Sequence, residues 1–105
     1  MAAVAFVGVP CSGHDCFPPR ISVASANNAT VFIGAEGGGT IPMHVVGDVW
    51  PAHTCGDDTH AGVIVSGSSR TFVGGKPVAR IGDGIGGLNC ASIISAGSLT
   101  VFCGG

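Results

Sequence analysis

The chain has 105 residues, a length that predicts one domain over residues 1–105, and only 10% of its residues are charged. Four Lys and Arg residues against six Asp and Glu residues give a formal net charge of −2, which excludes the basic surface of a nucleic-acid-binding protein. No apolar run approaches the roughly 20 residues of a membrane-spanning helix, and the apolar Met1–Val9 is too short for a secretory signal and lacks its basic flank.

Short apolar runs separated by turn-forming residues predict an all-β protein. Groups of Val, Ile, Thr and Phe are bounded by Gly, Asn, Ser or Pro, and no window carries the period of a helix. In chain order the predicted strands lie near Ala3–Val7, Ile21–Ala24, Thr30–Ile33, His44–Val46, Gly62–Val65, Thr71–Val73, Val78–Ile81, Ser92–Ser95 and Thr100–Cys103. Gly74-Gly75 and Gly86-Gly87 are typical of hairpin turns.

Two sequence elements recur along the chain. Gly67–Gly75 aligns without a gap with Gly97–Gly105, and Ala29–Gly34 matches both less closely. The second element, Pro42–Asp48, aligns with Pro77–Asp83 and ends in a Gly-Asp turn. One unit is therefore a short strand, a Gly-Ser turn, a strand ending in Phe, a Gly-rich hairpin turn, a strand and a Gly-Asp turn.

Each unit is too small to bury a hydrophobic core alone. We therefore expect three units to surround a common axis and share one core, with Phe32, Phe72 and Phe102 as equivalent inward positions. This arrangement is an approximate threefold design in a single chain, and its most natural partner is itself threefold.

Four His and five Cys residues, without a secretion signal, favour metal binding over a disulfide framework. The candidate ligands are His14, His53, His60 and Cys90, of which His53 and Cys90 follow the two Gly-Asp turns. Loops after equivalent strands converge at one end of a repeat structure, so ligands distant in sequence can meet there. Four nitrogen and sulfur donors complete the tetrahedron of one structural zinc ion, and such donors favour zinc over iron.

The remaining Cys and His residues have other expected roles. His44 is predicted to pack on a strand face, and Cys103 takes the packing position of Val73 in the neighbouring repeat. Cys55 competes for a ligand place, because it lies two residues after a candidate His on an extended segment. Cys11 and Cys16 are expected to be small buried hydrophobic residues or to form a local disulfide.

Catalytic patterns are weak, and the protein is predicted not to be an enzyme. No G-x-S-x-G nucleophile motif occurs. Asp48 and Asp83 hold the same place in two repeats, which is typical of turn residues whose carboxylates accept backbone hydrogen bonds. Arg80 is expected to pair with a turn carboxylate and not with a substrate.

The ordered set of motifs resembles the PAAR family, named for a Pro-Ala-Ala-Arg element. The best copy is Pro77–Asp83, and Gly13–Arg20 with Gly47–Gly56 resembles the phage-related branch of that family. The similarity covers nearly the whole chain. The first copy departs from the pattern, because Pro42-Met43-His44-Val45 lacks the Arg and the glycine-rich Glu36–Thr40 interrupts the hairpin.

This resemblance implies a small cone of short β-hairpins with pseudo-threefold repeats. Its base would cap a trimeric β-helical spike, one copy per trimer, and its apex would carry a zinc ion bound by His14, His53, His60 and Cys90. The implied function is a structural spike tip that sharpens the central spike of a contractile injection system, either a phage tail or a type VI secretion system, and pierces the target membrane through a transient contact. The implied location is the virion tail tip, or the bacterial cytoplasm before assembly and delivery.

Three other functions were compared with the spike tip. A zinc-binding adaptor would attach effector proteins to the spike, and an effector is expected to bind separately because no sequence remains for a fused one. A zinc enzyme would need an open coordination position and a general base. A glycan-binding module is disfavoured by one Trp and no Tyr.

Overall fold

The computed structural model describes residues 2–14, 16–23, 31–34, 38–87 and 90–104. The all-β prediction is confirmed, because these residues form short antiparallel strands and no helix. Nothing in these ranges could therefore cross a membrane as a helix. In chain order the strands are β1 (Ala2–Ala3), β2 (Phe32–Gly34), β3 (Thr40–Pro42), β4 (Val49–Cys55), β5 (Asp58–Ile64), β6 (Phe72–Val73), β7 (Lys76–Pro77), β8 (Gly84–Gly87), β9 (Cys90–Ile93) and β10 (Phe102–Cys103).

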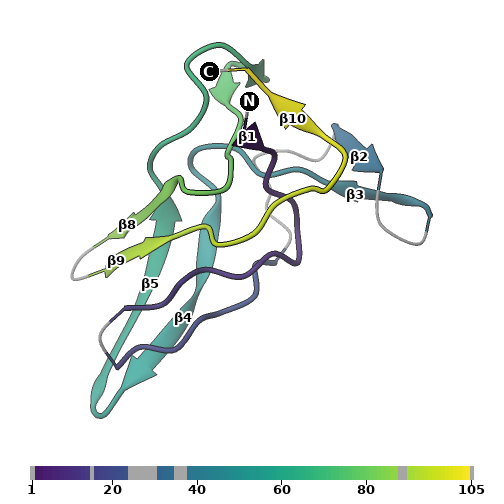
Figure 1. Ribbon diagram of the computed structural model, residues 1–105. Helices are drawn as coiled ribbons and strands as arrows, with labels where there is room; N and C mark the ends of the chain where they lie inside the picture. Colours follow the sequence, from purple (N-terminus) through teal and green to yellow (C-terminus); the bar gives the residue numbers. More distant parts are fainter. Residues whose placement is uncertain (1, 15, 24–30, 35–37, 88–89, 105) are drawn as a thin grey trace.

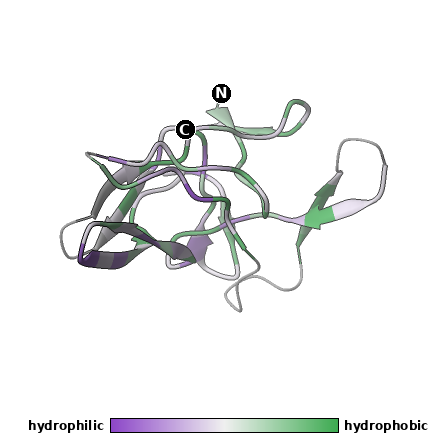
Figure 2. Ribbon diagram, turned by 90° about the horizontal axis from the view of Figure 1, so that it is seen from below, coloured by the Kyte–Doolittle hydropathy of each residue, from purple (hydrophilic) through white to green (hydrophobic). Residues whose placement is uncertain are grey.

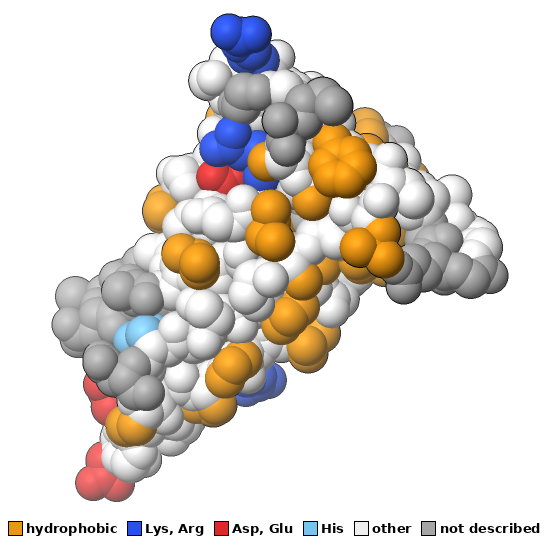
Figure 3. All heavy atoms as spheres, viewed as in Figure 1, with side chains coloured by type: hydrophobic (Ala, Val, Ile, Leu, Met, Phe, Trp, Pro, Cys, Tyr) orange, Lys and Arg blue, Asp and Glu red, His pale blue; other side chains and the backbone are white. Residues whose placement is uncertain are grey.

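The largest sheet has four strands in the order β4-β5-β8-β9. β4 and β5 form a hairpin whose turn contains Gly56 at a φ of +62°, a conformation that favours glycine. This hairpin reaches past β8 and β9 and forms one end of the molecule, the hairpin end (Figure 1). Acidic side chains lie at its extremity, whereas hydrophobic side chains continue along the same face toward the opposite end (Figure 3).

Three two-stranded ladders, here called arms, form the rest of the sheet structure. They are β2–β3, β6–β7 and β1–β10, and the last one pairs Ala2 with Cys103 near the two ends of the chain. The arms and both termini lie away from the hairpin end (Figure 1), and the arm β2–β3 stands out to one side of the body (Figure 2). The repeat predicted from Gly67–Gly75 and Gly97–Gly105 thus corresponds to two equivalent arms.

A closed ring of backbone hydrogen bonds marks the axis between the arms. The amide of Ala5 donates to the carbonyl of Ala79 (2.9 Å), that of His44 to Ala5 (2.9 Å), and that of Ala79 to His44 (3.0 Å). All three residues are fully buried. Three segments distant in sequence therefore meet in the same way, as the expected threefold arrangement requires.

A third copy of the Gly-Asp turn element, absent from the sequence alignment, lies near the N-terminus. Gly8, Gly47 and Gly82 have similar φ values of 107°, 100° and 89°. In each copy the residue after the glycine donates its amide to the carbonyl three positions earlier, and Val9 does so to Phe6 at 3.2 Å. Because Val9 stands where the other copies have Asp, the sequence comparison missed this turn.

The predicted inward orientation of the three repeat-equivalent phenylalanines is wrong. Phe32, Phe72 and Phe102 are 49%, 54% and 48% exposed. Side chains alternate along a strand, and the residue after each Phe takes the inward place instead. Cys103 is buried in this position, and its predicted packing role, equivalent to that of Val73 in the neighbouring repeat, is confirmed.

The core between the arms is built from small aliphatic and sulfur side chains, and a second core lies beneath the four-stranded sheet. The arm core consists of Val4, Ile33, Met43, Val78 and Cys103. The sheet core consists of Ala5, Val9, Cys11, Trp50, Ile64, Ala79, Ile85 and Ile94. The two cores meet at the ring of hydrogen bonds, since Val4 and Ala5 are adjacent in sequence.

Of the two predicted Gly-Gly turns, one is confirmed and one is wrong. Gly74 and Gly75 connect β6 to β7 with φ values of 56° and 79°. Gly86, in contrast, lies inside β8, where it pairs with Val63 and Ala91. The side chain of Val65 covers this glycine, since a Cβ placed there would meet Val65 Cγ1 at 3.0 Å. A glycine in a strand can mark such a close approach instead of a turn.

Candidate metal centre

The β4–β5 hairpin supplies two of the predicted ligands as a cross-strand pair. His53 of β4 and His60 of β5 are directly opposite in the register, so their side chains share one face of the sheet. The pairing shifts between Trp50, opposite Gly62, and His53. β4 therefore contains one extra residue there relative to β5, which is a β-bulge.

This bulge is what turns His53 inward. Trp50 and His53 are three positions apart, an odd spacing that would place them on opposite faces of a regular strand. With the extra residue both are buried, at 2% and 4% exposure. Pro51, which cannot donate a hydrogen bond to a strand partner, lies within the irregular segment, as is typical of proline in sheets.

The third histidine comes from a tight loop near the N-terminus. His14 and Phe17 exchange two backbone hydrogen bonds, of 3.1 and 2.8 Å, which close the loop. Gly13 enters it at a φ of 69°, and a Cβ there would meet the carbonyl oxygen of Phe17 at 2.6 Å. Only glycine fits this approach, so the motif Gly13-His14 fixes where the imidazole starts.

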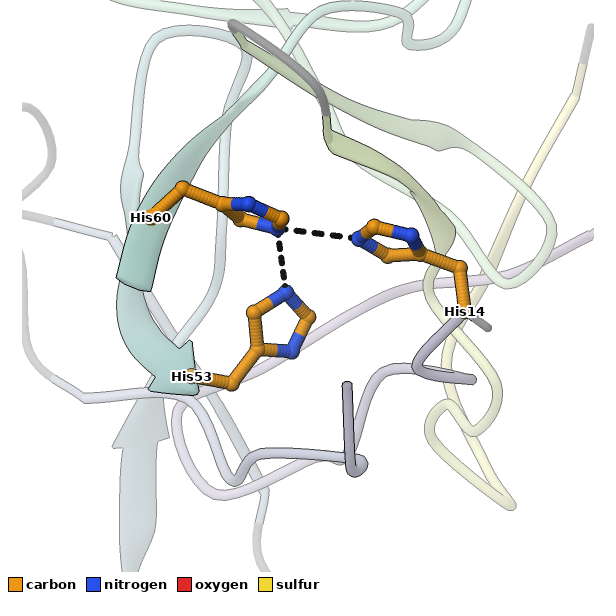
Figure 4. Close-up of side chains that lie close together, drawn as sticks. All are labelled: His14, His53 and His60. Atoms are coloured by element: carbon orange, nitrogen blue, oxygen red, sulfur yellow. Dashed lines mark hydrogen bonds between the residues drawn. The ribbon is translucent and has the colours of Figure 1, made fainter. Parts of the chain in front are cut away.

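The three imidazoles converge through their Nε2 atoms (Figure 4). Nε2 of His60 lies 2.9 Å from Nε2 of His14 and 2.6 Å from Nε2 of His53. The ligand atoms of the three residues all lie within 4.8 Å of one another. Three imidazole nitrogens this close together fit a bound cation, because neutral imidazole nitrogens coordinate metal ions. This cluster could therefore hold a metal ion.

Contacts behind the imidazoles prepare them for this role. Nδ1 of His53 lies 2.9 Å from the carbonyl oxygen of Pro18, which only accepts hydrogen bonds, so Nδ1 carries the proton and Nε2 keeps its lone pair. Nδ1 of His60 is buried with no hydrogen-bond partner among the described residues. The ring of Phe17 covers the cluster, with centroid distances of 4.8, 4.8 and 4.1 Å to His14, His53 and His60.

The electrostatics favour the neutral form of His60. Burial lowers the pKa of His60, and positive charge on His53 or His14 would lower it further, while Asp58 opposes the shift. A lowered histidine pKa favours the uncharged imidazole, which is the form that binds metal ions.

The fourth predicted ligand, Cys90, is placed only through its backbone. It begins β9, opposite Gly87 of β8, and its side chain lies outside the described part of the structure. Its role as a ligand stays a prediction.

Cys55 and Cys16 form a disulfide, with their Cα atoms 5.5 Å apart. Cys55 is therefore bonded to sulfur and not available as the competing ligand. The buried hydrophobic role and the local disulfide proposed for Cys16 are both wrong, because Cys16 is exposed and its partner is distant in sequence. Cys11 is buried, as predicted. The missed signal is a repeated spacing, since both His14-Asp15-Cys16 and His53-Thr54-Cys55 place Cys two residues after a histidine of the cluster.

His44 lies outside the cluster and is buried, as its predicted packing role requires. Its Nδ1 contacts Asp48 Oδ2 at 2.7 Å and its Nε2 contacts Ser22 Oγ at 2.9 Å. This order of contacts is that of a Ser-His-Asp triad, but the three side chains are at most 3% exposed. No substrate can reach them, and the role of the network is structural.

The two repeated aspartates act as predicted. Oδ2 of Asp48 accepts the amide hydrogen of Val45 (3.1 Å), and Oδ2 of Asp83 accepts that of Arg80 (2.7 Å). Arg80 also binds Asp83 through its guanidinium, at 3.0 and 2.9 Å, and this hydrogen bond raises the pKa of the arginine. Its predicted pairing with a turn carboxylate is confirmed. In the first copy, which lacks the Arg, His44 binds the aspartate instead.

Comparison with known proteins gives one family. The family model of the PAAR motif matches residues 21–87 and again residues 56–105, which together leave only the first 20 residues uncovered. No curated protein matches the chain. The match does not distinguish branches of the family, so the phage-related assignment stays a prediction.

Proposed function

Because this chain belongs to the PAAR motif family, we propose that it is the tip that caps and sharpens the trimeric central spike of a contractile injection system. The PAAR motif implies a spike-tip protein of such a system, of which type VI secretion is one example, and PAAR proteins are structural tips that sit on spike trimers. The observation that carries the proposal is the ring of hydrogen bonds among Ala5, His44 and Ala79, which gives one chain an approximate threefold axis. An object with this symmetry can match three identical chains with one copy of itself.

The end of the molecule that carries the three arms, opposite the hairpin end, has the surface that a spike would cover. Phe32, Phe72 and Phe102 are about half exposed at equivalent positions of the three arms. Exposed aromatic side chains are favoured anchors of protein interfaces, and strand edges of two-stranded arms can be extended by strands of a partner. We infer that these three phenylalanines contact the three chains of the spike in equivalent ways.

At the hairpin end we propose one zinc ion, bound by His14, His53, His60 and Cys90. Three imidazole nitrogens and one thiolate complete a tetrahedral structural site, which leaves no position for a reactive water. The ion would tie the N-terminal loop, the β4–β5 hairpin and the start of β9 together. We propose that this staple lets the point withstand penetration of a membrane.

The test is the stoichiometry and the location of spike binding. We expect one chain per spike trimer in the mass of the complex formed with the spike from the same source. Phe72→Ser should weaken this binding by at least about 10-fold, since interface aromatics contribute more than 1 kcal/mol when they act as anchors. The matched control is Ile93→Ser, which removes a similarly exposed apolar side chain (47%) from the four-stranded sheet. Three copies per trimer, or equal effects of both substitutions, would contradict the proposal.

A further inference from the structure

A disulfide lies beside the metal centre, and its two halves are each two residues from a ligand. Cys16 follows His14 in the N-terminal loop, and Cys55 follows His53 in β4. We propose that the Cys16–Cys55 disulfide is a redox-operated lock on the metal centre. Its oxidised form holds the His14 loop against the β4–β5 hairpin and slows release of the ion. Reduction of the disulfide removes this restraint, so that the ion is released faster. The inference rests on the metal centre of the proposed function.

Both halves of the disulfide are coupled rigidly to their neighbouring ligands. Cys55 is opposite Asp58 at the last rung of the hairpin, and the adjacent rung is reinforced by a 2.8 Å hydrogen bond between Thr54 and Thr59. Cys16 lies inside the loop that the two backbone hydrogen bonds between His14 and Phe17 close. A displacement of either sulfur therefore moves an imidazole.

Three hydrogen bonds between the loop and the hairpin lie on the far side of the loop from His14. Trp50 Nε1 donates to the carbonyl oxygen of Arg20 (3.1 Å), the Arg20 guanidinium donates to that of Ala52, and His53 Nδ1 donates to that of Pro18 (2.9 Å). These bonds hold residues 18–20. The disulfide is the covalent link, and it is the one nearest to His14 along the chain.

On its other side the loop is anchored to β9 by two hydrogen bonds. The amide of Ser12 donates to the carbonyl of Ile93 (2.8 Å), and that of Gly13 donates to Ser92 Oγ (3.0 Å). His14 thus lies between an anchor on β9 and a covalent tie to the hairpin. When the tie is cut, only noncovalent contacts hold the loop to the hairpin and keep His14 beside His53 and His60.

The disulfide is placed where a soluble thiol can react with it. Cys16 is exposed and Cys55 is partly exposed. Two glutathione molecules would supply two electrons and two protons, so that the S–S bond becomes two thiols and glutathione disulfide is formed; oxidation by glutathione disulfide is the reverse. Zinc does not change its redox state, so the electrons stay on sulfur.

Linkage makes the effect reciprocal. If the oxidised form binds the ion more tightly, the bound ion must stabilise the disulfide against reduction by the same factor. The equilibrium between the disulfide and glutathione, measured with and without zinc, therefore tests the coupling independently of release rates.

The first experiment compares zinc release from the oxidised and the glutathione-reduced chain, each loaded with zinc and mixed with a chromogenic chelator. We expect release to be about 10-fold faster from the reduced form, the scale on which groups behind the ligands alter metal affinity. The double variant Cys16→Ser, Cys55→Ser should release zinc at the fast rate in both conditions. The matched control Cys103→Ala, which removes a buried thiol of the arm core, should keep the difference.

The second experiment follows reduction of the disulfide by glutathione through thiol labelling and mass measurement. At equilibrium in a buffer of reduced and oxidised glutathione, zinc-loaded chains should keep a larger fraction of the disulfide than zinc-free chains. Equal release rates in the two redox states would overturn the lock while leaving the metal centre intact. Tighter binding in the reduced form that is lost in the double Ser variant would instead make the two thiols ligands, and would also overturn the lock. Absence of zinc from both forms would overturn the metal centre and the lock together.

Discussion

Single side chains carry the differences between the three equivalent units. His44 occupies the place of Ala5 and Ala79 on the axis, and from there its imidazole reaches Asp48. Arg80 binds Asp83 from the next position along the chain. The same requirement, a donor for the carboxylate of the turn, is thus met by two residue types at two positions.

Replacement of His44 should separate structure from metal binding. His44→Ala removes the partner of two buried polar groups and leaves a cavity, so we expect a loss of about 2–4 kcal/mol in the free energy of unfolding. The zinc content should stay at one per chain, because His44 does not belong to the histidine cluster. His60→Ala is the comparison and should lose the ion. Elemental analysis with denaturant unfolding measures both, and loss of zinc in His44→Ala would contradict this separation.

The lowered pKa of His60 makes the stability of the metal-free protein depend on pH. In the unfolded chain this histidine gains its proton near its ordinary value of 6.5, whereas in the folded chain it does so at a lower pH. The unfolded state therefore binds more protons between the two values, and stability falls as the pH drops below about 6.5. Thermal unfolding at pH 7.5 and 5.5 tests this, and His60→Asn should flatten the response. A metal-free protein that is more stable at pH 5.5 would show the opposite sign.

At the scale of elements, the sequence predicted the arms better than the sheet that holds His53 and His60. The arms carry the repeated Gly-Ser and Phe-x-Gly signals, and β6 and β10 lie where the repeats placed them. β4 was not predicted, because Pro51 and the bulge interrupt its alternation of side chains. The three histidines were nevertheless predicted to lie together, because that prediction depends on residue type and loop position and not on the strand assignment. The inward orientation of His53, in contrast, depends on the bulge.

The glycine of the Gly-Ser turn is an element-scale constraint shared by two repeats. A Cβ on Gly67 would lie 2.8 Å from the carbonyl oxygen of Val78, and one on Gly97 would lie 2.8 Å from the Cβ of Ala3. We expect Gly67→Ala to lower the free energy of unfolding by about 1–3 kcal/mol, the usual cost of overpacking. Gly34→Ala is the control, because nothing lies within 4 Å of its Cβ position. Urea unfolding of the two variants measures the difference, and equal stabilities would show that the turn can adjust.

At the scale of the molecule, one of the three arms is made from both ends of the chain. β1 pairs with β10 in the same manner as β6 pairs with β7, where a covalent turn connects the strands. The sequence could not reveal this, because the third copy of the turn element lacks its Asp and its arm is divided between residues distant in sequence. The threefold arrangement was predicted from three copies of the Phe-containing element and only two copies of the Gly-Asp turn element. The hydrogen-bond ring shows that the third segment, which contains Ala5, occupies an equivalent place.

A circular permutant tests this equivalence of the arms. A short Gly-Ser linker between residues 105 and 1, with new ends between Gly74 and Gly75, should give a chain that folds and keeps its zinc, because an existing turn is exchanged for a new one. Opening the chain between Gly56 and Asp57 should weaken zinc binding, since that turn connects the strands of His53 and His60. Thermal unfolding and zinc content distinguish the two, and failure of the first permutant to fold would show that the arms are not interchangeable.

The hydrogen-bond ring has a further consequence for recognition of a symmetric partner. A trimer presents the same surface after each rotation of 120°, so a single chain with an approximate threefold axis has three indistinguishable ways to seat on it. This degeneracy multiplies the association constant by three, or about 0.6 kcal/mol. It also means that a given chain of the trimer lies on the side of His44, of Ala5 or of Ala79 in one third of the assembled particles each. An average taken with imposed threefold symmetry would therefore superimpose one imidazole on two methyl groups.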